Sequence, residues 1–400
     1  MSLLDNYREM VPKGTIDFLK CLAERSKGRK ILHVNSTKVG GGVAEILRSL
    51  LPLLQDIGMD ARWEVISGTE EFFSTTKAFH NALQGQENHL SQRMLQNYME
   101  VNKENARHLS FDADYVIIHD PQPAALIGSR PPKGKWIWRC HIDISRPQWK
   151  AWSFLRQFIV KYDAAIFSLP RFAQRLPIPQ FLIYPSIDPL SDKNRDLSRE
   201  EQTRILKSLN IHTDKPILLQ VSRFDRFKDP LGVIQAYRFV KKHNDVQLVL
   251  AGGEATDDPE GAMVLSEVRE AARDDPDIHV LLLPPDANLE INALQRAATI
   301  VLQKSLREGF GLTVAEAMWK GKPVIGGFAG GITVQLVYGV TGFTVNSTEG
   351  AAFRIHYLLD NPEVMTKMGE DAREYVRRNF LITRHLGDWL SLMSYLGQKS

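Results

Sequence analysis

The sequence predicts an α/β protein built from two Rossmann-like, doubly wound domains. A chain of 400 residues exceeds a single ordinary hydrophobic core, so its length alone suggests two domains. Short β-branched and apolar runs alternate with amphipathic stretches, and this alternation occurs in two series. The runs are mostly apolar throughout, which is typical of strands covered by helices on both faces. A polar segment that contains prolines separates the two series.

The first series begins with a strand, a glycine turn and a helix. The turn is Gly40-Gly41-Gly42, and the helix after it places leucines from Leu47 to Leu54 on one face and ends near Gly58. The strands expected in this series are 31–34, 63–66, 115–119, 136–140, 164–168 and 181–184.

The boundary between the domains is predicted at Pro185-Ser186-Ile187-Asp188-Pro189 and the polar residues 191–202 that follow. We therefore expect an N-terminal Rossmann-like domain over residues 1–188 and a C-terminal Rossmann-like domain over 189–382. A final helix at about 383–400, apolar on one face from 386 to 396, is expected to pack back on the first domain.

The second series supplies another six strands. One of its helices spans 230–240, with Asp229 as N-cap and Pro230 at the first helical position. Further helical stretches run from 351 to about 379. The strands expected in this series are 217–221, 246–251, 279–283, 300–303, 323–325 and 343–345.

Composition and charge exclude several classes of protein. A net charge of +3 on 400 residues predicts no broad nucleic-acid or membrane surface. Two cysteines, Cys21 and Cys140, exclude a disulfide framework and favour a reducing compartment. Residues 1–20 lack the apolar core of a signal peptide, and no apolar run reaches the roughly 18 residues that a membrane span needs. We therefore expect a cytoplasmic protein.

The most informative motif follows the predicted strand 300–303. It reads Arg307-Glu308-Gly309-Phe310-Gly311-Leu312-Thr313-Val314-Ala315-Glu316-Ala317 and leads into a helix predicted over 313–320. Gly309 and Gly311 let the backbone approach a ligand closely. The N–H groups of Gly311, Leu312 and Thr313 would lie at a helix N-terminus, which suits a diphosphate.

Two carboxylates, Glu308 and Glu316, flank this helix start. They would repel phosphates and are better suited to the hydroxyls of a sugar or a ribose. A purely structural alternative exists for each of them. Thr313 and Glu316 have the spacing of a capping box, so Glu316 could satisfy the helix start, and Glu308 could be a solvated loop residue.

A second motif, Ser222-Arg223-Phe224-Asp225-Arg226-Phe227-Lys228, follows the predicted strand 217–221. Strand ends of this kind form the ligand crevice of open α/β sheets. The Arg223 guanidinium offers forked donors to phosphate, and Lys228 offers a point charge. The alternative is a solvated loop with surface cations, which fits Arg226 better than the other two.

In the first domain, the glycine turn and two polar segments, 119–123 and 139–143, follow predicted strands, and residues 79–85 add further polar groups. Gly40-Gly41-Gly42 resembles a NAD-binding turn, but Glu45 occupies the place of that motif's third glycine, although Glu64 has the spacing of a ribose-binding acid. The other candidates for ligand binding are His80, Asn81, Asp120, Gln122, His141 and Asp143. Each of them has a local structural alternative, such as the turn that an Asp before Pro starts.

Taken together, Ser222-Arg223, Lys228 and Glu308-x7-Glu316 resemble the donor site of retaining GT-B glycosyltransferases of the glycogen-synthase-like and sucrose-synthase-like family. The resemblance spans the whole chain and implies a GT-B fold with a cleft between two domains. It implies that Arg223 and Lys228 bind the donor diphosphate, that Glu308 contacts the donor sugar and that Glu316 binds the ribose. The backbone from Phe310 to Thr313 would cradle phosphate.

The same resemblance implies further roles. Gly41 and Gly42 would close over the donor phosphates, and Leu283 would lie near the base. His141 would lie beside the anomeric carbon, and Asp120 or Asp143 near the acceptor. The segments at 35–45, 79–85, 119–123 and 138–143 closely resemble those of the trehalose glycosyltransferring synthases. The segment 327–331 departs from that pattern.

The reaction that this resemblance implies is transfer of glucose from ADP-, UDP- or GDP-glucose to free glucose, reversibly, with retention, giving α,α-trehalose. The alternatives are a retaining trehalose phosphorylase, another nucleotide-sugar glycosyltransferase, a NAD-dependent oxidoreductase and a non-catalytic sugar-binding protein. We expect no tightly bound cofactor and no metal site, with Mg²⁺ as a stimulating ion on the diphosphate. The expected partners are the nucleotide sugar, glucose and trehalose. The oligomeric state stays open, with a homodimer among its alternatives.

Overall fold

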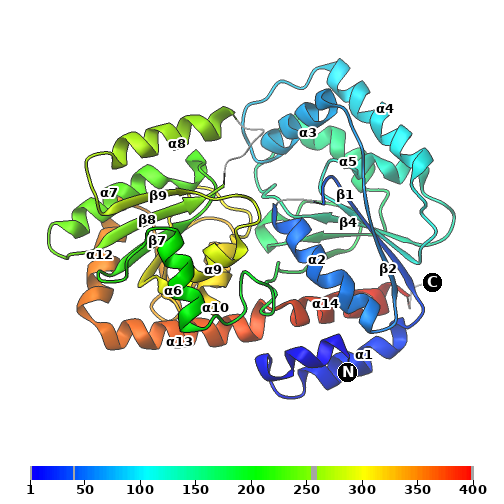
Figure 1. Ribbon diagram of the computed structural model, residues 1–400. Coiled ribbons are helices and arrows are strands. Elements are labelled where there is room, and N and C mark those ends of the chain that lie inside the picture. The colour runs from blue at the N-terminus through cyan, green and yellow to red at the C-terminus, as the bar shows by residue number, and fades with distance from the viewer. Residues whose placement is uncertain (1, 39–40, 254–258, 398–400) are drawn as a thin grey trace. The chain divides into compact units, whose positions relative to one another are not determined.

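The computed structural model describes residues 2–38, 41–253 and 259–397. It divides the chain into two compact units. Unit 1 comprises the described part of Met1–Pro185 and Ile382–Ser400, and unit 2 comprises Ser186–Leu381. Each unit is a parallel six-stranded sheet with helices on both faces, so the predicted pair of doubly wound α/β domains is confirmed (Figure 1).

The sheet of unit 1 has the strand order β2-β1-β3-β4-β5-β6, with all neighbours parallel. Its central strands β3 and β5 are buried along their whole length and β4 in all but its first residue, because helices cover both faces. The strands are β1 (Lys30–Asn35), β2 (Asp60–Val65), β3 (Tyr115–His119), β4 (Lys135–Cys140), β5 (Ala164–Phe167) and β6 (Gln180–Leu182).

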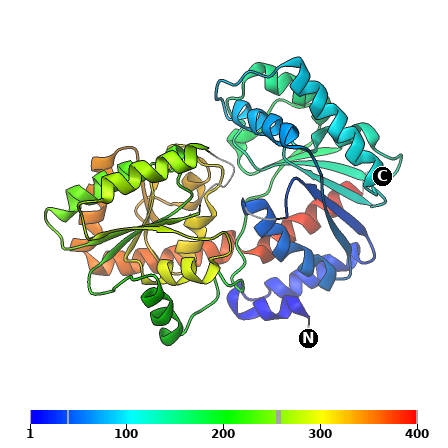
Figure 2. The same ribbon diagram turned by 45° about the horizontal axis from the view of Figure 1, so that its top comes forward.

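Helices α1 (Thr15–Ala23), α2 (Gly41–Asp56) and α14 (Ile382–Gly397) form one layer of unit 1. Helices α3 (Glu70–Leu83), α4 (Gln92–His108) and α5 (Trp149–Ile159) form another. The red C-terminal helix α14 lies beside the blue α1 and α2 in both Figure 1 and Figure 2. The Tyr115 hydroxyl donates to the carbonyl oxygen of Met393 at 2.9 Å, which ties α14 to the start of β3.

The sheet of unit 2 has the order β12-β11-β10-β7-β8-β9 and is likewise parallel. Its strands are β7 (Ile217–Val221), β8 (Gln247–Gly252), β9 (Ile278–Leu282), β10 (Ile300–Gln303), β11 (Val324–Gly327) and β12 (Gly342–Val345). Its helices are α6 (Arg199–Ser208), α7 (Pro230–Lys241), α8 (Pro259–Ala272), α9 (Asn288–Ala297), α10 (Leu312–Trp319), α11 (Ile332–Gln335), α12 (Thr348–Asp360) and α13 (Pro362–Asn379).

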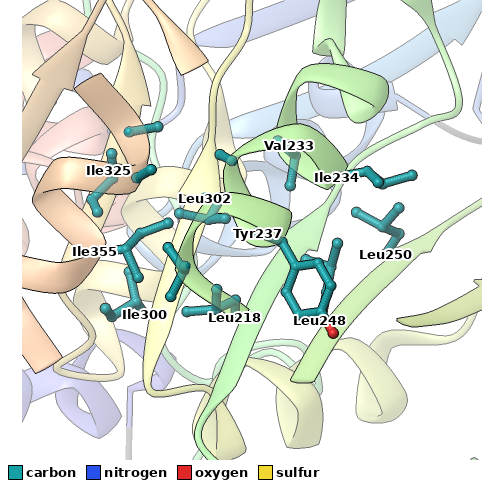
Figure 3. Packing of buried hydrophobic residues seen from close by; sticks show 14 of the residues in the cluster. Leu218, Val233, Ile234, Tyr237, Leu248, Leu250, Ile300, Leu302, Ile325 and Ile355 are labelled. Carbon is teal, nitrogen blue, oxygen red and sulfur yellow. The ribbon is translucent and has the colours of Figure 1, made fainter. Parts of the chain in front are cut away.

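A dry core joins this sheet to α7, α8 and α12. Leu218, Leu248 and Ile300 on the strands meet Tyr237 of α7 and Ile355 of α12, and each of these side chains is at most 1% exposed (Figure 3). The amphipathic pattern of α7 supplies this face, and Asp229 caps its start by accepting from the N–H of Gly232 at 3.2 Å, as predicted. This core fixes the strand ends from which the loops of the next section emerge.

Strand order reverses once in each sheet, and these reversals place the functional loops. In unit 1 the chain runs from β1 outward to β2 and then returns to the other side of β1 as β3. In unit 2 it runs from β7 through β8 to β9 and returns beside β7 as β10. Such switch points are where open α/β sheets bind ligands, because adjacent loops leave in opposite directions and open a crevice at the carboxyl ends of the strands.

The predicted elements agree with the observed ones apart from their ends, which differ by one to three residues. The strand predicted to extend to Tyr184 ends at Leu182, and the predicted helix 313–320 starts one residue earlier. Gly40 of the predicted glycine turn lies outside the described residues, as does the end of the predicted C-terminal helix beyond 397. None of the described helices is both long and apolar enough to cross a membrane.

Candidate active site

In unit 2, an ion pair spans the switch point between β7 and β10. The Lys228 ammonium lies 2.7 Å from Oε2 of Glu308, and the two side chains are only 17% and 9% exposed. The hydroxyl of Ser305 donates to the same carboxylate oxygen at 3.2 Å. The loops that follow two neighbouring strands therefore bring together Lys228, the residue predicted to bind the diphosphate, and Glu308, the residue predicted to bind the sugar.

Local hydrogen bonds hold Lys228 in this position. The Asp225 carboxylate accepts from the N–H of Phe227 at 2.7 Å and starts a short 3₁₀ turn, Arg226–Lys228. The Gln220 amide on β7 donates to the carbonyl oxygen of Lys228 at 2.8 Å. Asp229 adopts a left-handed conformation with φ of 51° and pairs with the ammonium of Lys304. The backbone at Lys228 is thus fixed from both sides.

The two neighbouring arginines differ in placement. Arg223 is exposed, and its nearest carboxylate is that of Asp225 at 3.5 Å, so its guanidinium is accessible to a ligand. Arg226 forms an ion pair with Glu267 at 2.8 Å. This contact agrees with the structural role that its position in the sequence favoured.

Helix α10 begins beside this ion pair. Gly311 is in the left-handed region with φ of 80°, and no side chain caps the helix start. The capping-box alternative for Thr313 and Glu316 is therefore wrong. The Thr313 hydroxyl instead donates to the Gln303 amide oxygen at 3.3 Å, because the helix starts at Leu312 and Thr313 already lies in its first turn. The backbone N–H groups at this end are left for an anion.

A second glycine loop backs the Glu308 loop. The N–H of Gly331 donates to the carbonyl oxygen of Gly309 at 2.8 Å. Gly330 has φ of 46°, and a Cβ at this position would lie 1.6 Å from the carbonyl oxygen of Glu308. A side chain there would displace Glu308, so the close approach of these loops requires glycine.

Glu316 lies on the buried face of α10 and is 1% exposed. Its carboxylate accepts from the Gln295 amide at 3.4 Å and lies 3.7 Å from the Lys193 ammonium. The buried Lys320 ammonium donates to Asn194, at 2.9 Å, and to the other side of the Gln295 amide, at 2.8 Å. Sequence reasoning did not identify this network, whose members come from three separate segments of unit 2.

Phe310 and Leu283, also predicted to bind the nucleotide sugar, are held in the fold by hydrogen bonds of their backbone. The Phe310 ring is buried against Phe380, 5.6 Å away between centroids, and its carbonyl oxygen accepts from the Gln335 amide at 2.6 Å. Leu283 is buried, and its N–H donates to the carbonyl oxygen of Gly252 at 2.8 Å.

In unit 1, three histidines form a continuous row across the adjacent strands β1, β3 and β4. Nδ1 of His33 lies 3.0 Å from Nε2 of His119, and Nδ1 of His119 lies 2.9 Å from Nε2 of His141. The first two rings are buried and the third is partly exposed. Burial lowers the pKa of all three imidazoles, to about 3 for His33. The rings are therefore neutral at pH 7.

Asp120 follows β3 and supports His141. Its carboxylate accepts from the backbone N–H of His141 at 2.7 Å. Its φ of 64° is unusual for a residue other than glycine and marks a strained turn at the end of the strand. Burial raises the pKa of this carboxyl group to about 7. The predicted acceptor residues Asp120 and His141 are thus brought together by the fold.

A small cavity lies beside the histidine row. It measures about 10 Å³, enough for about one water molecule, and its polar lining comes from His119, Arg139, His141 and His385. The Arg139 guanidinium is fully buried and donates to the carbonyl oxygen of Ile183 at 2.7 Å, while its Nε and Nη1 have no described partner. Burial lowers its pKa to about 10, so it stays charged at neutral pH.

The remaining predicted residues of unit 1 lie on other segments. His80 and Asn81 lie in the last turn of α3, which accepts from the N–H of Gln148 in the loop after His141. Gln122 has a buried amide oxygen without a described partner, and Asp143 accepts from the N–H of Ser145 at 2.9 Å. Gly41 and Gly42 are exposed at the start of α2. Among the described residues, no group of three or more acidic, His or Cys side chains is placed to hold a metal ion.

Sequence reasoning missed His33, Arg139 and His385 as members of one site. The detectable signal was that His33, His119 and His141 lie in or just after strands that a doubly wound sheet places side by side. His385 had no such signal, because it is brought in by α14 from the end of the chain.

Comparison with known proteins covers nearly the whole chain. Residues 33–174 match the family model "Trehalose synthase, N-terminal domain", and residues 201–375 match "Glycosyl transferases group 1". The chain is 49% identical to trehalose synthase from Pyrococcus horikoshii over 98% of this chain and 96% of the relative. It is 29% identical to trehalose phosphorylase from Pleurotus pulmonarius, over 97% of this chain but only 60% of that protein.

Among solved structures, sucrose-phosphate synthase from Thermosynechococcus elongatus has a TM-score of 0.72 with 17% identity, covering 93% of this chain and 100% of that one. At this level of identity the likeness concerns the fold alone.

Proposed function

The chain belongs to the trehalose synthase family of GT-B glycosyltransferases, and we propose that it transfers glucose from a nucleoside-diphosphate glucose to free glucose. The product is α,α-trehalose, and the reaction proceeds with retention and is reversible. The predicted roles of Arg223, Lys228, Glu308 and Glu316 belong to this proposal.

The observation that supports the proposal best is the Lys228–Glu308 ion pair beside the N-terminus of α10. In a nucleotide sugar, one oxygen joins the anomeric carbon to the diphosphate, so the nearest sugar hydroxyls lie only a few bonds from the anionic phosphates. A site for such a donor needs a cation and a hydroxyl acceptor within a few ångströms of each other. The ammonium and carboxylate, at 2.7 Å, meet this requirement, and the helix N-terminus adds N–H donors for phosphate.

In this reaction the bond between the anomeric carbon and the diphosphate oxygen breaks as the acceptor oxygen bonds to the same carbon. The leaving diphosphate takes the acceptor proton on the front face. Arg223, Lys228 and the first N–H groups of α10 stabilise the charge that develops on the leaving group. No protein base is needed for this step. A Mg²⁺ ion on the diphosphate would add to this stabilisation, and the ion is held by phosphate oxygens.

The test is product analysis with ADP-, UDP- and GDP-glucose, each offered with free glucose, in the presence of Mg²⁺ or a chelator. We expect a non-reducing disaccharide from at least one donor, cleaved by a trehalase to glucose alone. Trehalose with the matching nucleoside diphosphate should regenerate the nucleotide sugar.

A parallel reaction with glucose 1-phosphate and glucose tests the phosphorylase alternative. If disaccharide forms from glucose 1-phosphate but from none of the nucleotide sugars, the proposal is wrong and the chain is a phosphorylase. No disaccharide from any donor would refute it altogether.

A further inference from the structure

The histidine row in unit 1 is a hydrogen-bonded chain with a defined direction. Each contact joins Nδ1 of one ring to Nε2 of the next, in the order His33, His119, His141. The rings are also stacked, with centroids 5.2 Å apart and interplanar angles of 25° and 20°. Both ring nitrogens of His119 are therefore engaged, and His141 keeps Nδ1 as its only nitrogen outside the chain.

Neutral imidazole carries one proton, so this chain has two consistent proton arrangements. In the first, every ring is protonated at Nδ1, and His141 presents an Nδ1–H donor. In the second, every ring is protonated at Nε2, and His141 presents a bare Nδ1. A mixed arrangement would set two donors or two lone pairs against each other at 2.9–3.0 Å. The tautomer of His141 is thus decided by the rings behind it.

The inner end of the chain favours the first arrangement. Nε2 of His33 is buried without a described hydrogen-bond partner, and so is the indole Nε1–H of Trp389. The two rings are in edge contact, with centroids 5.6 Å apart. A buried N–H without an acceptor is rarer in proteins than a buried acceptor without a donor, because an orphaned donor is costly. The arrangement that leaves Nε2 of His33 without a proton is therefore favoured.

The charged and titratable groups around the chain also keep it neutral. Arg139 of β4 is buried and charged, so it opposes a further positive charge. His385 of α14 donates through Nδ1 to the carbonyl oxygen of Tyr184 at 3.0 Å, because a carbonyl only accepts, and this ring is neutral as well. Asp120 lies behind the backbone N–H of His141 and forms no described contact with the imidazoles.

We propose that His119 and His33 are positioning residues that lock His141 as the Nδ1–H tautomer, so that His141 donates a hydrogen bond to the bound sugar and does not act as a base. The inference rests on the proposed function, since it needs a sugar beside His141. The inference adds that unit 1 supplies a hydrogen-bond donor of fixed orientation, His141. The proton of the acceptor glucose still goes to the leaving diphosphate.

Selective ¹⁵N labelling of histidine tests the tautomer directly, because two-bond proton–nitrogen correlations distinguish protonated from bare ring nitrogens. With the ligand-free protein at pH 7, we expect Nδ1–H and bare Nε2 for the three rings, with assignments from single His→Asn variants. A bare Nδ1 on His141, or a cationic ring in the chain, would overturn the inference.

Kinetics test the positioning role. His119→Phe keeps the ring volume but removes both nitrogens, and it should lower kcat about 10- to 100-fold through loss of orientation at His141. The KM for the nucleotide sugar should change less than about threefold, since Arg223, Lys228 and Glu316, which are proposed to bind its diphosphate and ribose, lie in unit 2. His119→Asn retains an amide donor near the place of Nδ1 and should recover most of the loss. Tyr115→Phe at the other end of β3 is the matched buried control, since it removes a buried hydrogen bond to Met393 outside the site, and it should keep kcat within about threefold.

Failure of the proposed function and failure of the positioning role give different results. If the wild type makes no disaccharide from any nucleotide sugar, the proposed function fails, and the labelling still decides the tautomer. If disaccharide forms but His119→Phe keeps the wild-type kcat, or His119→Asn rescues nothing, the positioning role is refuted and the proposed function stands.

Discussion

The candidate sites of the two units are built from different kinds of chemical group. In unit 2 the site is an ion pair between Lys228 and Glu308 at a glycine-lined helix start. In unit 1 it is a row of neutral histidines, of which His33 and His119 are buried. Charges that stay partly accessible can change partners when an anionic ligand arrives. Neutral rings in a dry interior can hold one geometry but cannot easily gain or lose a proton. We therefore call the ion-pair site of unit 2 the responsive half, because its charges can change partners. We call the histidine row of unit 1 the rigid half, because its rings hold one geometry.

The largest effect that we expect is a loss of folding stability of unit 1 at acidic pH, because its buried histidines are neutral in the folded state. A ring whose pKa is lowered in the folded state stabilises the fold above its unfolded pKa of about 6.5, and this stability is lost as the pH falls below that value. For His33, with a folded pKa of about 3, the loss at pH 5 is about 2 kcal/mol. His119, His141 and His385 shift in the same direction.

Tryptophan fluorescence suits this measurement, because six of the seven tryptophans lie in unit 1 and Trp319 alone lies in unit 2. Urea unfolding should show falling stability of unit 1 between pH 7 and 5. His33→Phe should weaken this pH dependence. A free energy of unfolding that is flat over this range would contradict the neutral histidine row.

The next largest effect concerns the responsive half. Lys228→Met removes the ammonium but keeps much of the side-chain volume, and kcat/KM for the nucleotide sugar should fall about 100- to 1000-fold, because one donor to the leaving diphosphate is lost. Arg226→Met in the same 3₁₀ turn is the control, since Arg226 pairs with Glu267. Equal losses in both variants would mean that the turn, and not the charge, matters.

A smaller effect should separate nucleotide binding from transfer. Glu316→Gln should weaken binding of the preferred nucleoside diphosphate about tenfold, because a ribose hydroxyl loses a charged acceptor. Binding of inorganic pyrophosphate should not change. Titration calorimetry with both ligands checks this, and a parallel loss for pyrophosphate would assign Glu316 to the packing of α10 instead. Arg223→Ala, in contrast, should mainly slow transfer.

The smallest effect has the opposite sign. Glu308→Gln releases Lys228 from its ion pair, which for a partly buried pair is worth about 1 kcal/mol. The free ammonium should bind the nucleoside diphosphate about threefold to tenfold more tightly, while transfer to glucose is strongly reduced. Glu267→Gln, which frees Arg226 only, is the matched control. Weaker diphosphate binding by Glu308→Gln would show that Lys228 does not exchange partners.

Sequence patterns predicted most of the fold, because both sheets are parallel and covered. Buried strands of this kind read as short apolar runs, so Tyr115–His119, Ile217–Val221 and Ile300–Gln303 were located to the residue. Edge elements were less certain. β6 ends two residues early at Leu182, because this edge strand is only partly buried and its pattern is weak.

The site was predictable only where it is local in sequence. Glu308 and Gly311 lie in one motif after β10, and Lys228 follows the neighbouring strand β7. The switch point between these strands explains why Lys228 and Glu308 meet. The Glu316 network draws on segments between Lys193 and Lys320, and the histidine row joins residues 108 positions apart, from His33 to His141, so spacing within a motif carries no signal of either. The capping-box reading failed because the N-cap of the helix is Gly311, two residues before the Thr313 that the pattern requires there.

The return of α14 to unit 1 has a consequence for how the chain matures. Unit 2 is one continuous segment, whereas unit 1 needs residues from both termini. Pro185 and Ile382 are about 200 residues apart, so at about 5–20 residues per second the ribosome needs roughly 10–40 s to pass from one to the other. Throughout that interval the nascent chain has no Trp389 to close over His33, nor His385 beside Arg139. The donor half can therefore be completed during translation, while the histidine half is finished only after the last helix leaves the ribosome.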